Sequence, residues 1–180
     1  MSTPPHPLPL PDPPLSDGDL HLRPWAPADA PVLAAAWLDA EIARWTGVPH
    51  RHDVEAAARW IRGDADRRAR GLSLDLVAVV DDAIVGEVGL SSIDRPRRTG
   101  EIGWWVAPHR RGRGLATRAV ALVAEWAVTE LSIDEVVARC HVDNPASSGV
   151  ARAAGFWPVS EAEPFRVWSF RLDGGATLGS

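Results

Sequence analysis

The chain has 180 residues, a net charge of -5 and 46% hydrophobic residues. This length predicts one domain with enough apolar side chains for a packed core. The acidic balance produces no overall field toward nucleic acid or membranes, so we expect neither as a partner. A single cysteine, Cys140, excludes an internal disulfide and a cysteine-based metal cluster, and we expect no metal site. The sequence contains no apolar run of membrane length and no signal-peptide core, which makes the cytoplasm the expected compartment.

Proline dominates the start of the chain, with seven prolines among residues 1–17. This composition predicts an extended or disordered arm outside the fold. A polyproline ligand for a partner domain is the alternative. The domain itself is expected over residues 18–173, followed by a flexible tail at 174–180.

Apolar periodicity and turn residues predict a mixed sheet flanked by helices. Asp53 is the expected N-cap of the third helix, with Val54 on the buried face, and Asp81-Asp82 is the expected turn of a hairpin. The predicted elements are, in chain order, a strand at 20–24, helices at about 27–37, 40–45 and 53–70, strands at 74–80, 83–90 and 101–106, a helix at 115–130, a strand at 135–141, a helix at 145–154, and strands at 156–159 and 167–172.

The segment from Glu101 to Thr117 carries the most informative pattern, because an apolar strand leads through a basic, glycine-rich turn directly into an amphipathic helix. Backbone N–H groups at a helix N-terminus lack partners within the helix and lie where its dipole is positive, which predicts a site for a phosphate or pyrophosphate. Gly112 and Gly114 let the backbone approach such an anion because they have no Cβ. An ordinary helix start and an Arg-Gly tract that binds RNA are the alternatives, and one such tract in an acidic domain supports RNA binding poorly.

Three motifs resemble those of the GCN5-related N-acetyltransferases. The segment Arg111-Gly-Arg-Gly-Leu-Ala116 is similar to the family pattern Arg/Gln-x-x-Gly-x-Gly/Ala, and residues 144–156 are similar to Asn-x-x-Ser-x-x-Val…Gly-Phe. The run Glu101-Ile-Gly-Trp-Trp looks like the RimJ/RimL-like branch, the ribosomal-protein alanine/serine acetyltransferases. The segments Leu22-Arg-Pro-Trp25 and Ile42-Ala-Arg-Trp45 also fit that branch, and the resemblance covers roughly Leu20 to Leu172.

The resemblance implies an α/β (α+β) fold with a single mixed, mostly antiparallel sheet of about seven strands and four to five flanking helices. The fourth and fifth strands of that fold splay apart. The implied activity is transfer of acetyl from acetyl-CoA to a primary amine, by direct attack in a ternary complex. No metal takes part in this chemistry.

The resemblance also assigns residues to the acetyl-CoA site. The loop amides would hold the pyrophosphate, with Arg111 or Arg113 adding charge. On the preceding strand, a bulge at Val106 and its neighbours would free backbone N–H groups for the pantetheine and the acetyl oxygen. The full implied set is Trp105, Val106, Ala107, Arg111, Gly112, Arg113, Gly114, Leu115, Ala116, Thr117, Asn144 and Ser147. The alternatives are a solvated basic turn for the arginines and an ordinary turn residue for Asn144.

Two residues are the candidate catalytic pair, Glu101 and Ser147. Glu101 lies on an otherwise apolar strand, where it could accept the amine proton directly or through a water, or could instead bond a neighbouring strand. Many members of the family protonate the leaving thiolate with a tyrosine, but this chain has no Tyr. Ser147, at the serine of the downstream motif, is the expected replacement, and a helix cap is its alternative role.

Other titratable residues are weaker candidates for this chemistry. Glu87 and His141 are alternative bases, and Cys140 is a possible acid that is more typical of a small buried core residue. His109 is expected on a surface loop. The acceptor pocket is expected between residues 47–52 and 161–165, where Glu161 and Glu163 could attract a cationic amine or act as the base, and Arg51 and His52 could bind a carboxylate.

The acceptor is either a protein N-terminus or a small-molecule amine such as an antibiotic or polyamine. An exposed groove would favour the first, and acidic residues in an open cleft would favour the second. A CoA-binding or interaction domain without turnover is the rival from another class, because the usual tyrosine is missing. We expect a monomer or a homodimer.

Overall fold

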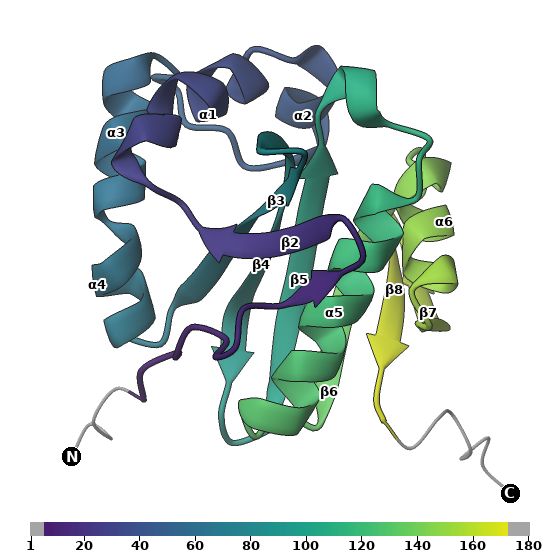
Figure 1. Cartoon of the computed structure of the whole chain (residues 1–180). Helices are drawn as coiled ribbons and strands as arrows, with labels where there is room; N and C mark the ends of the chain where they lie inside the picture. The colour runs from purple at the N-terminus through teal and green to yellow at the C-terminus, as the bar shows by residue number, and fades with distance from the viewer. Residues whose placement is uncertain (1–5, 173–180) are drawn as a thin grey trace, which may run out of the picture.

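The computed structural model describes residues 6–172, which form one open sheet of eight strands and six α-helices (Figure 1). The strand order is β1-β2-β3-β4-β5-β6-β8-β7, and every neighbouring pair is antiparallel except β5 and β6. The strands are β1 (Ser16–Asp17), β2 (Leu20–Pro24), β3 (Ser73–Val80), β4 (Ala83–Asp94), β5 (Thr99–Val106), β6 (Glu135–His141), β7 (Trp157–Ala162) and β8 (Phe165–Phe170). The predicted fold class, a mixed and mostly antiparallel sheet with flanking helices, is confirmed.

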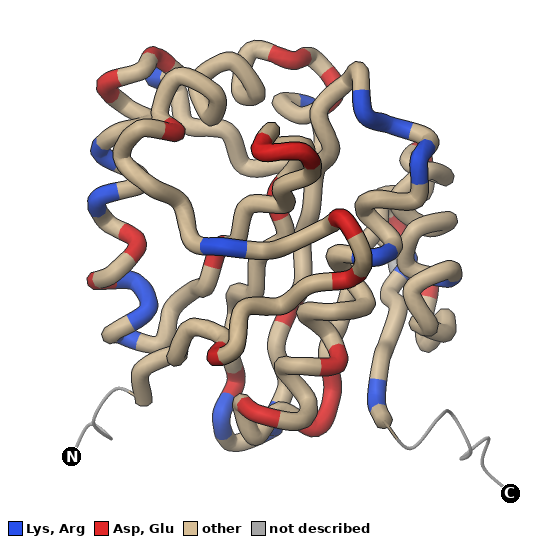
Figure 2. Tube along the Cα trace, in the orientation of Figure 1, with Lys and Arg blue, Asp and Glu red and all other residues tan. Residues whose placement is uncertain are grey.

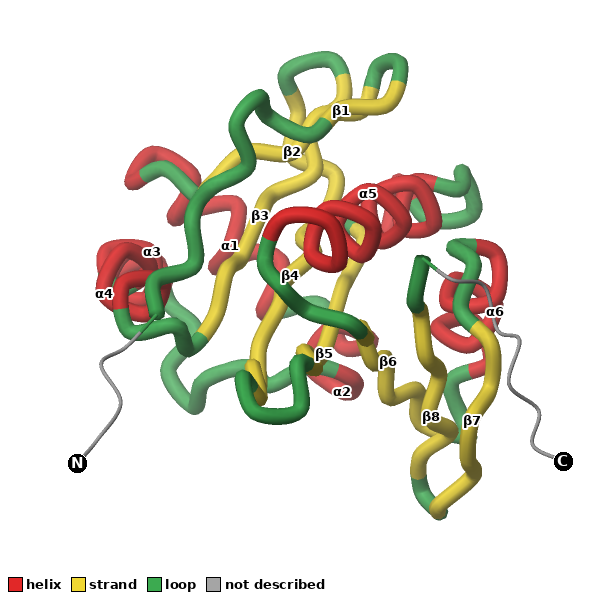
Figure 3. Tube along the Cα trace, turned by 90° about the horizontal axis from the view of Figure 1, so that it is seen from below, coloured by secondary structure: helices red, strands yellow, loops and turns green. Residues whose placement is uncertain are grey.

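The helices cover both faces of the sheet (Figure 3). Their bounds are α1 (Ala30–Trp37), α2 (Ala40–Trp45), α3 (Val54–Arg62), α4 (Asp64–Ala69), α5 (Leu115–Glu130) and α6 (Pro145–Ala153), with short 3-10 turns η1 (Pro27–Asp29) and η2 (Pro108–Arg110). Helices α5 and α6 pack on one face, and α1, α2 and α3 pack on the other. Among the described residues, no helix is both long enough and apolar enough to cross a membrane.

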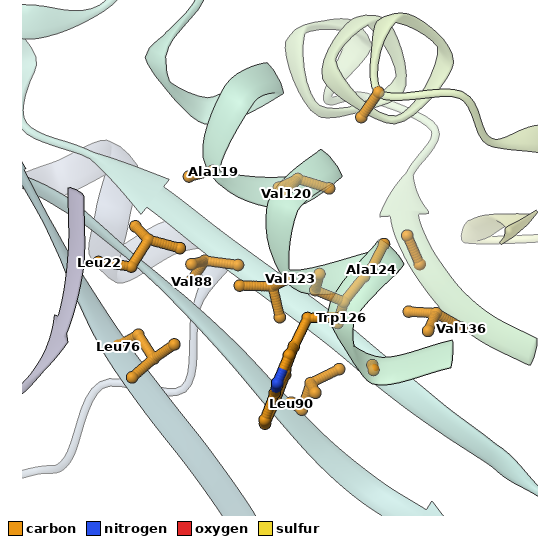
Figure 4. Packing of buried hydrophobic residues seen from close by; sticks show 14 of the residues in the cluster. Leu22, Leu76, Val88, Leu90, Ala119, Val120, Val123, Ala124, Trp126 and Val136 are labelled. Atoms are coloured by element: carbon orange, nitrogen blue, oxygen red, sulfur yellow. The ribbon is translucent and has the colours of Figure 1, made fainter. Parts of the chain in front are cut away.

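The larger core lies between α5 and the sheet (Figure 4). Val120, Val123 and Ala124 of α5 are at most 1% exposed, and they face strand residues such as Leu76 and Val88. Their spacing of three and four residues places them on one side of the helix, as an amphipathic pattern requires. This packing fixes the start of α5, and therefore the glycine loop before it, against the end of β5.

The predicted helix over residues 53–70 is interrupted at Gly63, so two helices, α3 and α4, replace it. The N–H of Gly63 donates to both Arg59 O and Trp60 O, which closes the end of α3 in a tighter turn. Asp53 does cap α3, accepting the N–H of Ala56 at 2.7 Å. The expectation that Val54 is buried is wrong, because the first turn of α3 faces solvent there and leaves Val54 49% exposed.

Part of the predicted proline-rich arm packs on the domain. Leu8 is 1% exposed and belongs to the larger core, and its N–H donates to Arg68 O at 2.9 Å. Residues 16–17 pair with β2 as an additional strand, β1. The expectation that the arm lies outside the fold therefore does not hold for Leu8 and β1, because leucines between the prolines anchor an extended chain on an apolar surface. The division into arm, domain and tail stays a prediction, and the tail at 174–180 lies outside the described residues.

The sheet opens between β5 and β6. These two parallel strands are paired only over residues 99–101 and 135–137. Beyond that point β5 stays paired with β4 as far as Val106, and β6 stays paired with β8 as far as His141. The predicted splay between the fourth and fifth strands is confirmed, and the two strands are the fifth and sixth here because β1 precedes them.

Candidate active site

Two clefts meet where β5 and β6 diverge. The first, here called the loop cleft, has a volume of about 440 Å³ and is bounded by the glycine loop, α2 and the N-termini of α5 and α6. The second, the strand cleft, has a volume of about 720 Å³ and lies over the sheet face that carries Glu101. The residues that line both clefts are Trp45, Thr46, Trp104, Trp105, Asn144 and Ser147. A molecule in one cleft can therefore touch a molecule in the other.

The loop before α5 is shaped to hold an anion. Gly112 and Gly114 both have φ of +73°, a backbone conformation that side chains disfavour, and a Cβ at either position would meet open space. Arg118 N–H donates to Gly114 O at 3.1 Å as the first turn of α5 forms, so the amides of residues 115–117 have no partner within the helix. Open space, glycines and free amides at a helix N-terminus fit a phosphate or pyrophosphate group.

The basic residues of this loop form a blue stretch of the trace between β5 and α5 (Figure 2), and their side chains have different surroundings. The guanidinium of Arg111 donates to Val106 O at 3.1 Å and pairs with Asp39 at 2.6 Å. Asp39 in turn caps α2, and its pKa is lowered mainly by the hydrogen bond from Arg111. Arg111 therefore fastens the loop to α2, and much of its charge is neutralised. Arg110 lines the loop cleft, whereas Arg113 is exposed outside it.

We expect Arg110→Gln to weaken binding of coenzyme A roughly tenfold, because a charge-assisted hydrogen bond contributes about 1.5 kcal/mol or more. Arg111→Gln should lower the melting temperature and change this affinity less. Calorimetric titration and thermal unfolding measure the two effects. Arg62→Gln, on the exposed side of α3, removes the same charge far from the loop and is the control. Equal losses of affinity in all three variants would show that only net charge matters.

The edge of β5 offers backbone N–H donors to the gap that opens where β5 and β6 diverge. Ala107 N–H donates to Val85 O at 2.9 Å. Because hydrogen bonds alternate along an antiparallel ladder, Trp105 also faces β4, while the N–H groups of Trp104 and Val106 point into the gap. Of the three predicted backbone donors, only Val106 therefore faces the gap, and Trp104 is a second donor that the sequence did not indicate.

The bulge that the resemblance implies at Val106 is absent from this part of β5. The ladder between β4 and β5 keeps one register from Val106 to Glu101. A shift occurs instead between Ser91 and Asp94, at the opposite end of β4, where Ser92 has φ of +50°. The gap thus arises from divergence of β6 and not from a distortion of β5.

The N-terminus of α6 brings Asn144 and Ser147 to the junction of the clefts. Asn144 is the N-cap, and its Oδ1 accepts the N–H of Ser147 at 3.1 Å. The side-chain N–H groups of Asn144 remain available to a ligand. Ser147 is in the first turn and is not the cap, and within residues 6–172 its hydroxyl has no hydrogen-bond partner. A free hydroxyl at this junction can donate a hydrogen bond to a leaving group.

Glu101 lies at the closed end of the splay, in the strand cleft. Its side chain is 34% exposed, and its Oε2 lies 3.3 Å from the guanidinium of Arg139 on β6. The Glu101 carboxylate is therefore ion-paired and accessible to solvent, and the ion pair holds it on the side of the sheet that faces the strand cleft. From there it can reach an amine in the strand cleft directly or through a water.

Glu87 occupies the same sheet face and is far more enclosed by protein. Trp25 Nε1 donates to its Oε2 at 2.6 Å, and Trp105 Nε1 donates to its Oε1 at 3.2 Å. Burial raises the pKa of Glu87 to about 8, with a further rise from Asp75, while the indole bonds oppose the shift. A carboxyl that titrates near neutral pH at the wall of a cleft is a candidate functional group.

The remaining candidates are placed less favourably. His141 lines the strand cleft, where its Nδ1 is occupied as the acceptor of the Asp143 N–H at 3.1 Å. Burial raises the pKa of Cys140 to about 11, which suits a core thiol. Glu161 pairs with Arg166 on the surface. Glu161, Glu163, Arg51, His52 and His109 line neither cleft.

Most of the predicted acetyl-CoA residues come together in the loop cleft. Those lining it are Trp105, Val106, Arg111, Gly112, Gly114, Leu115, Ala116, Thr117, Asn144 and Ser147. Ala107 and Arg113 do not line it. Three further lining residues were not predicted: Arg110, which belongs to the same basic run, and Trp45 and Thr46 at the end of α2, where the sequence has no local signal for a ligand.

Comparison with known proteins agrees with this geometry. A family model described as an acetyltransferase (GNAT) domain matches residues 19–157. The chain is 24% identical to an uncharacterized N-acetyltransferase, p20 of Bacillus licheniformis, over 76% of this chain and 78% of that one. It is 26% identical to the ribosomal-protein-serine acetyltransferase of Escherichia coli (strain K12), over 57% of each chain. RimJ of Mycobacterium smegmatis, in complex with CoA-disulfide, shares the fold with a TM-score of 0.76 and 21% identity, over 88% of this chain and 84% of that one.

The chain therefore belongs to the GCN5-related N-acetyltransferase family and is an acyltransferase. Its neighbours include RimJ and a ribosomal-protein-serine acetyltransferase, in agreement with the predicted resemblance to the RimJ/RimL-like branch.

Proposed function

We propose that the protein transfers acetyl from acetyl-CoA to a primary amine, by direct attack in a ternary complex. The observation that carries this proposal is the meeting of the loop cleft and the strand cleft at the β5–β6 divergence. One cleft has the features of an anion site, and the other has carboxyl groups that suit a cationic amine. Two substrates bound in this way would meet beside Ser147, which lines both clefts.

The loop cleft fits acetyl-CoA. When bound, acetyl-CoA supplies an acetyl thioester, whose carbonyl must be polarised and whose sulfur must receive a proton. The free amides that follow Gly114 would hold the pyrophosphate, with Arg110 adding charge. The N–H groups of Trp104 and Val106 would bond the pantetheine and the acetyl oxygen, as preorganised donors do in an oxyanion site.

Glu101 and Ser147 have complementary roles in this proposal. An ammonium ion that becomes an amide loses two protons from nitrogen, while the departing sulfur gains one. Glu101 accepts a proton from the attacking nitrogen as the C–N bond forms, directly or through a water. The Ser147 hydroxyl donates a hydrogen bond to the sulfur as the C–S bond breaks, gives it a proton and takes one back from water. The other proton of the ammonium leaves before the attack.

The proposed acceptor is a protein N-terminus. The support is the relative named a ribosomal-protein-serine acetyltransferase. A small-molecule amine is the second candidate, which the carboxyl groups of Asp75, Glu87 and Glu101 along the strand cleft favour.

Free thiol release, measured with acetyl-CoA and a panel of peptides and small amines, tests this function. The chain has no lysine, so self-acetylation at lysine cannot contribute to the signal. We expect Ser147→Ala and Glu101→Gln each to lower kcat about 100-fold, the lower end of the range for a general acid or base. Ser160→Ala on β7 and Glu130→Gln at the end of α5 are matched controls outside both clefts. The roles are wrong if both site variants keep the wild-type kcat and pH profile.

A further inference from the structure

The floor of the strand cleft has a gap in its side chains, and a carboxyl group lies on each side of it. Gly89 of β4 and Gly103 of β5 are directly opposite each other in the ladder. A Cβ at Gly103 would meet open space, whereas a Cβ at Gly89 would lie 2.6 Å from Oδ1 of Asp75, whose carboxyl covers that glycine. Glu101 lies two residues from Gly103 on the same sheet face, and Glu87 faces Trp105 two residues away in the other direction. A nitrogen above Gly103 therefore lies between the carboxyl groups of Glu101 and Glu87 along the strands.

We propose that Glu87 is a second catalytic residue, which binds the acceptor's α-ammonium group in the strand cleft and takes its first proton. This proposal rests on the acetyl transfer proposed above. The ammonium gives one proton to the Glu87 carboxylate and becomes a neutral amine. The amine nitrogen then forms the C–N bond and gives its second proton to Glu101. The sulfur leaves with the proton of the Ser147 hydroxyl, which takes a proton back from water. Glu87 and Glu101 return their protons to water, so that one proton is released per acetyl transfer.

The surroundings of Glu87 hold the carboxyl in place and leave room for this contact. The rings of Trp25 and Trp105 stack with centroids 6.5 Å apart, and each donates its N–H to a different carboxyl oxygen. A carboxylate has about four acceptor positions, so two remain for an ammonium group. Both Glu87 and Trp105 line the strand cleft.

The basicity of Glu87 suits one class of amine. Its pKa is raised to about 8, because burial and the carboxyl of Asp75 on β3 outweigh the two indole bonds and the cation of Arg67 on α4. An α-amino group has a pKa of about 7.7–8.0, so its proton moves to Glu87 with almost no change in free energy. A lysine side chain, with a pKa of about 10.4, would transfer its proton a few hundredfold less readily, by about 2.4 pKa units.

The experiment compares wild type, Glu87→Gln and Trp25→Phe across pH 6 to 10. The acceptors are a peptide with a free N-terminus, the same peptide with a blocked N-terminus and one lysine, and a single amino-acid amide. For the free N-terminus, we expect Glu87→Gln to lose at least tenfold in kcat/KM at pH 7. This loss should shrink above pH 9, where water already deprotonates the amine. Trp25→Phe removes the indole hydrogen bond that stabilises the Glu87 carboxylate, which raises the pKa of Glu87 further. The increase of kcat/KM with pH should therefore occur at a higher pH in Trp25→Phe than in wild type.

Each outcome bears on one of the two proposals. No thiol release by wild type with any acceptor would overturn the acetyl transfer itself. Turnover by wild type with an unchanged pH profile in Glu87→Gln would overturn only the role of Glu87, as would a loss that is equal at every pH. Melting temperature and coenzyme A affinity establish that each variant is folded. Turnover of the amino-acid amide would support a small α-amine, and turnover of the peptide alone would support a protein N-terminus.

Discussion

Gly114→Glu is expected to raise the dissociation constant for acetyl-CoA at least about a hundredfold, since like charges placed together cost several kcal/mol. Gly114 caps α5 with φ of +73°, and a Cβ there would point into open space beside the free amides. The substitution puts a carboxylate where the pyrophosphate is proposed to lie. It also forces a side chain into a backbone conformation that costs about 1–2 kcal/mol.

Gly114→Ala separates these two effects, because it introduces the backbone strain without the charge. We expect it to lower the melting temperature and to weaken acetyl-CoA binding much less than Gly114→Glu does. Calorimetric titration gives the affinities, and thermal unfolding shows that each variant is native at the titration temperature. If folded Gly114→Glu binds acetyl-CoA as tightly as wild type, the pyrophosphate lies elsewhere and the loop is only a helix start.

The sequence correctly predicted turns, helix caps and helix bounds that depend on residues close together in the chain. The Asp81-Asp82 turn forms as expected, with φ of 50° and 60° at the two residues, a conformation typical of a tight hairpin. Asp53 caps α3, and α5 runs from Leu115 to Glu130 as its apolar period predicts. The break at Gly63 was missed because one glycine inside an apolar helical pattern does not by itself signal an end.

Contacts between distant segments decide the features that the sequence did not indicate. Arg111 and Asp39 are 72 positions apart, so nothing near the glycine loop showed that this arginine is paired. Trp25 lies 62 positions from Glu87, and the order of strands in the sheet brings its indole to the carboxyl. The expectation for Glu87 was weak because its surroundings exist only in the folded chain.

The second large effect is a fall in stability as pH rises from 5 to 8, which Glu87→Gln should largely remove. The pKa of Glu87 rises from an ordinary 4.5 to about 8 on folding, so the folded state binds the proton more tightly than the unfolded chain does. Stability from this group is therefore complete below pH 4.5 and is lost as pH rises toward 8. Because the residue is partly open to the cleft, we expect a loss on the order of 3 kcal/mol.

Other shifted groups contribute little to the slope in this range. Burial acts to raise the pKa of Asp29, but the hydrogen bonds from Arg23 and the Ala26 N–H outweigh it and lower that pKa. The pKa of Asp39 is lowered mainly by the hydrogen bond from Arg111, so the effects of both groups appear only in more acidic solution. The pKa of Cys140 is about 11, which puts its effect in alkaline solution. Asp75 is the exception, because burial raises its pKa too, and it should leave a smaller slope of the same sign in Glu87→Gln.

Thermal and urea unfolding of wild type and Glu87→Gln at pH 5, 6, 7 and 8 measure this effect. The two proteins should be similarly stable at pH 5, where Glu87 is neutral, and the variant should be the more stable one at pH 8. Glu101→Gln, which changes a partly exposed carboxyl on the same face, is the matched control for the substitution itself. Glu87→Gln would therefore gain stability at pH 8 while it loses activity, as expected when a buried titratable group is kept for function. A wild-type stability that stays flat from pH 5 to 8 would mean that Glu87 is already ionised throughout this range, and it would remove the match between Glu87 and an α-amine.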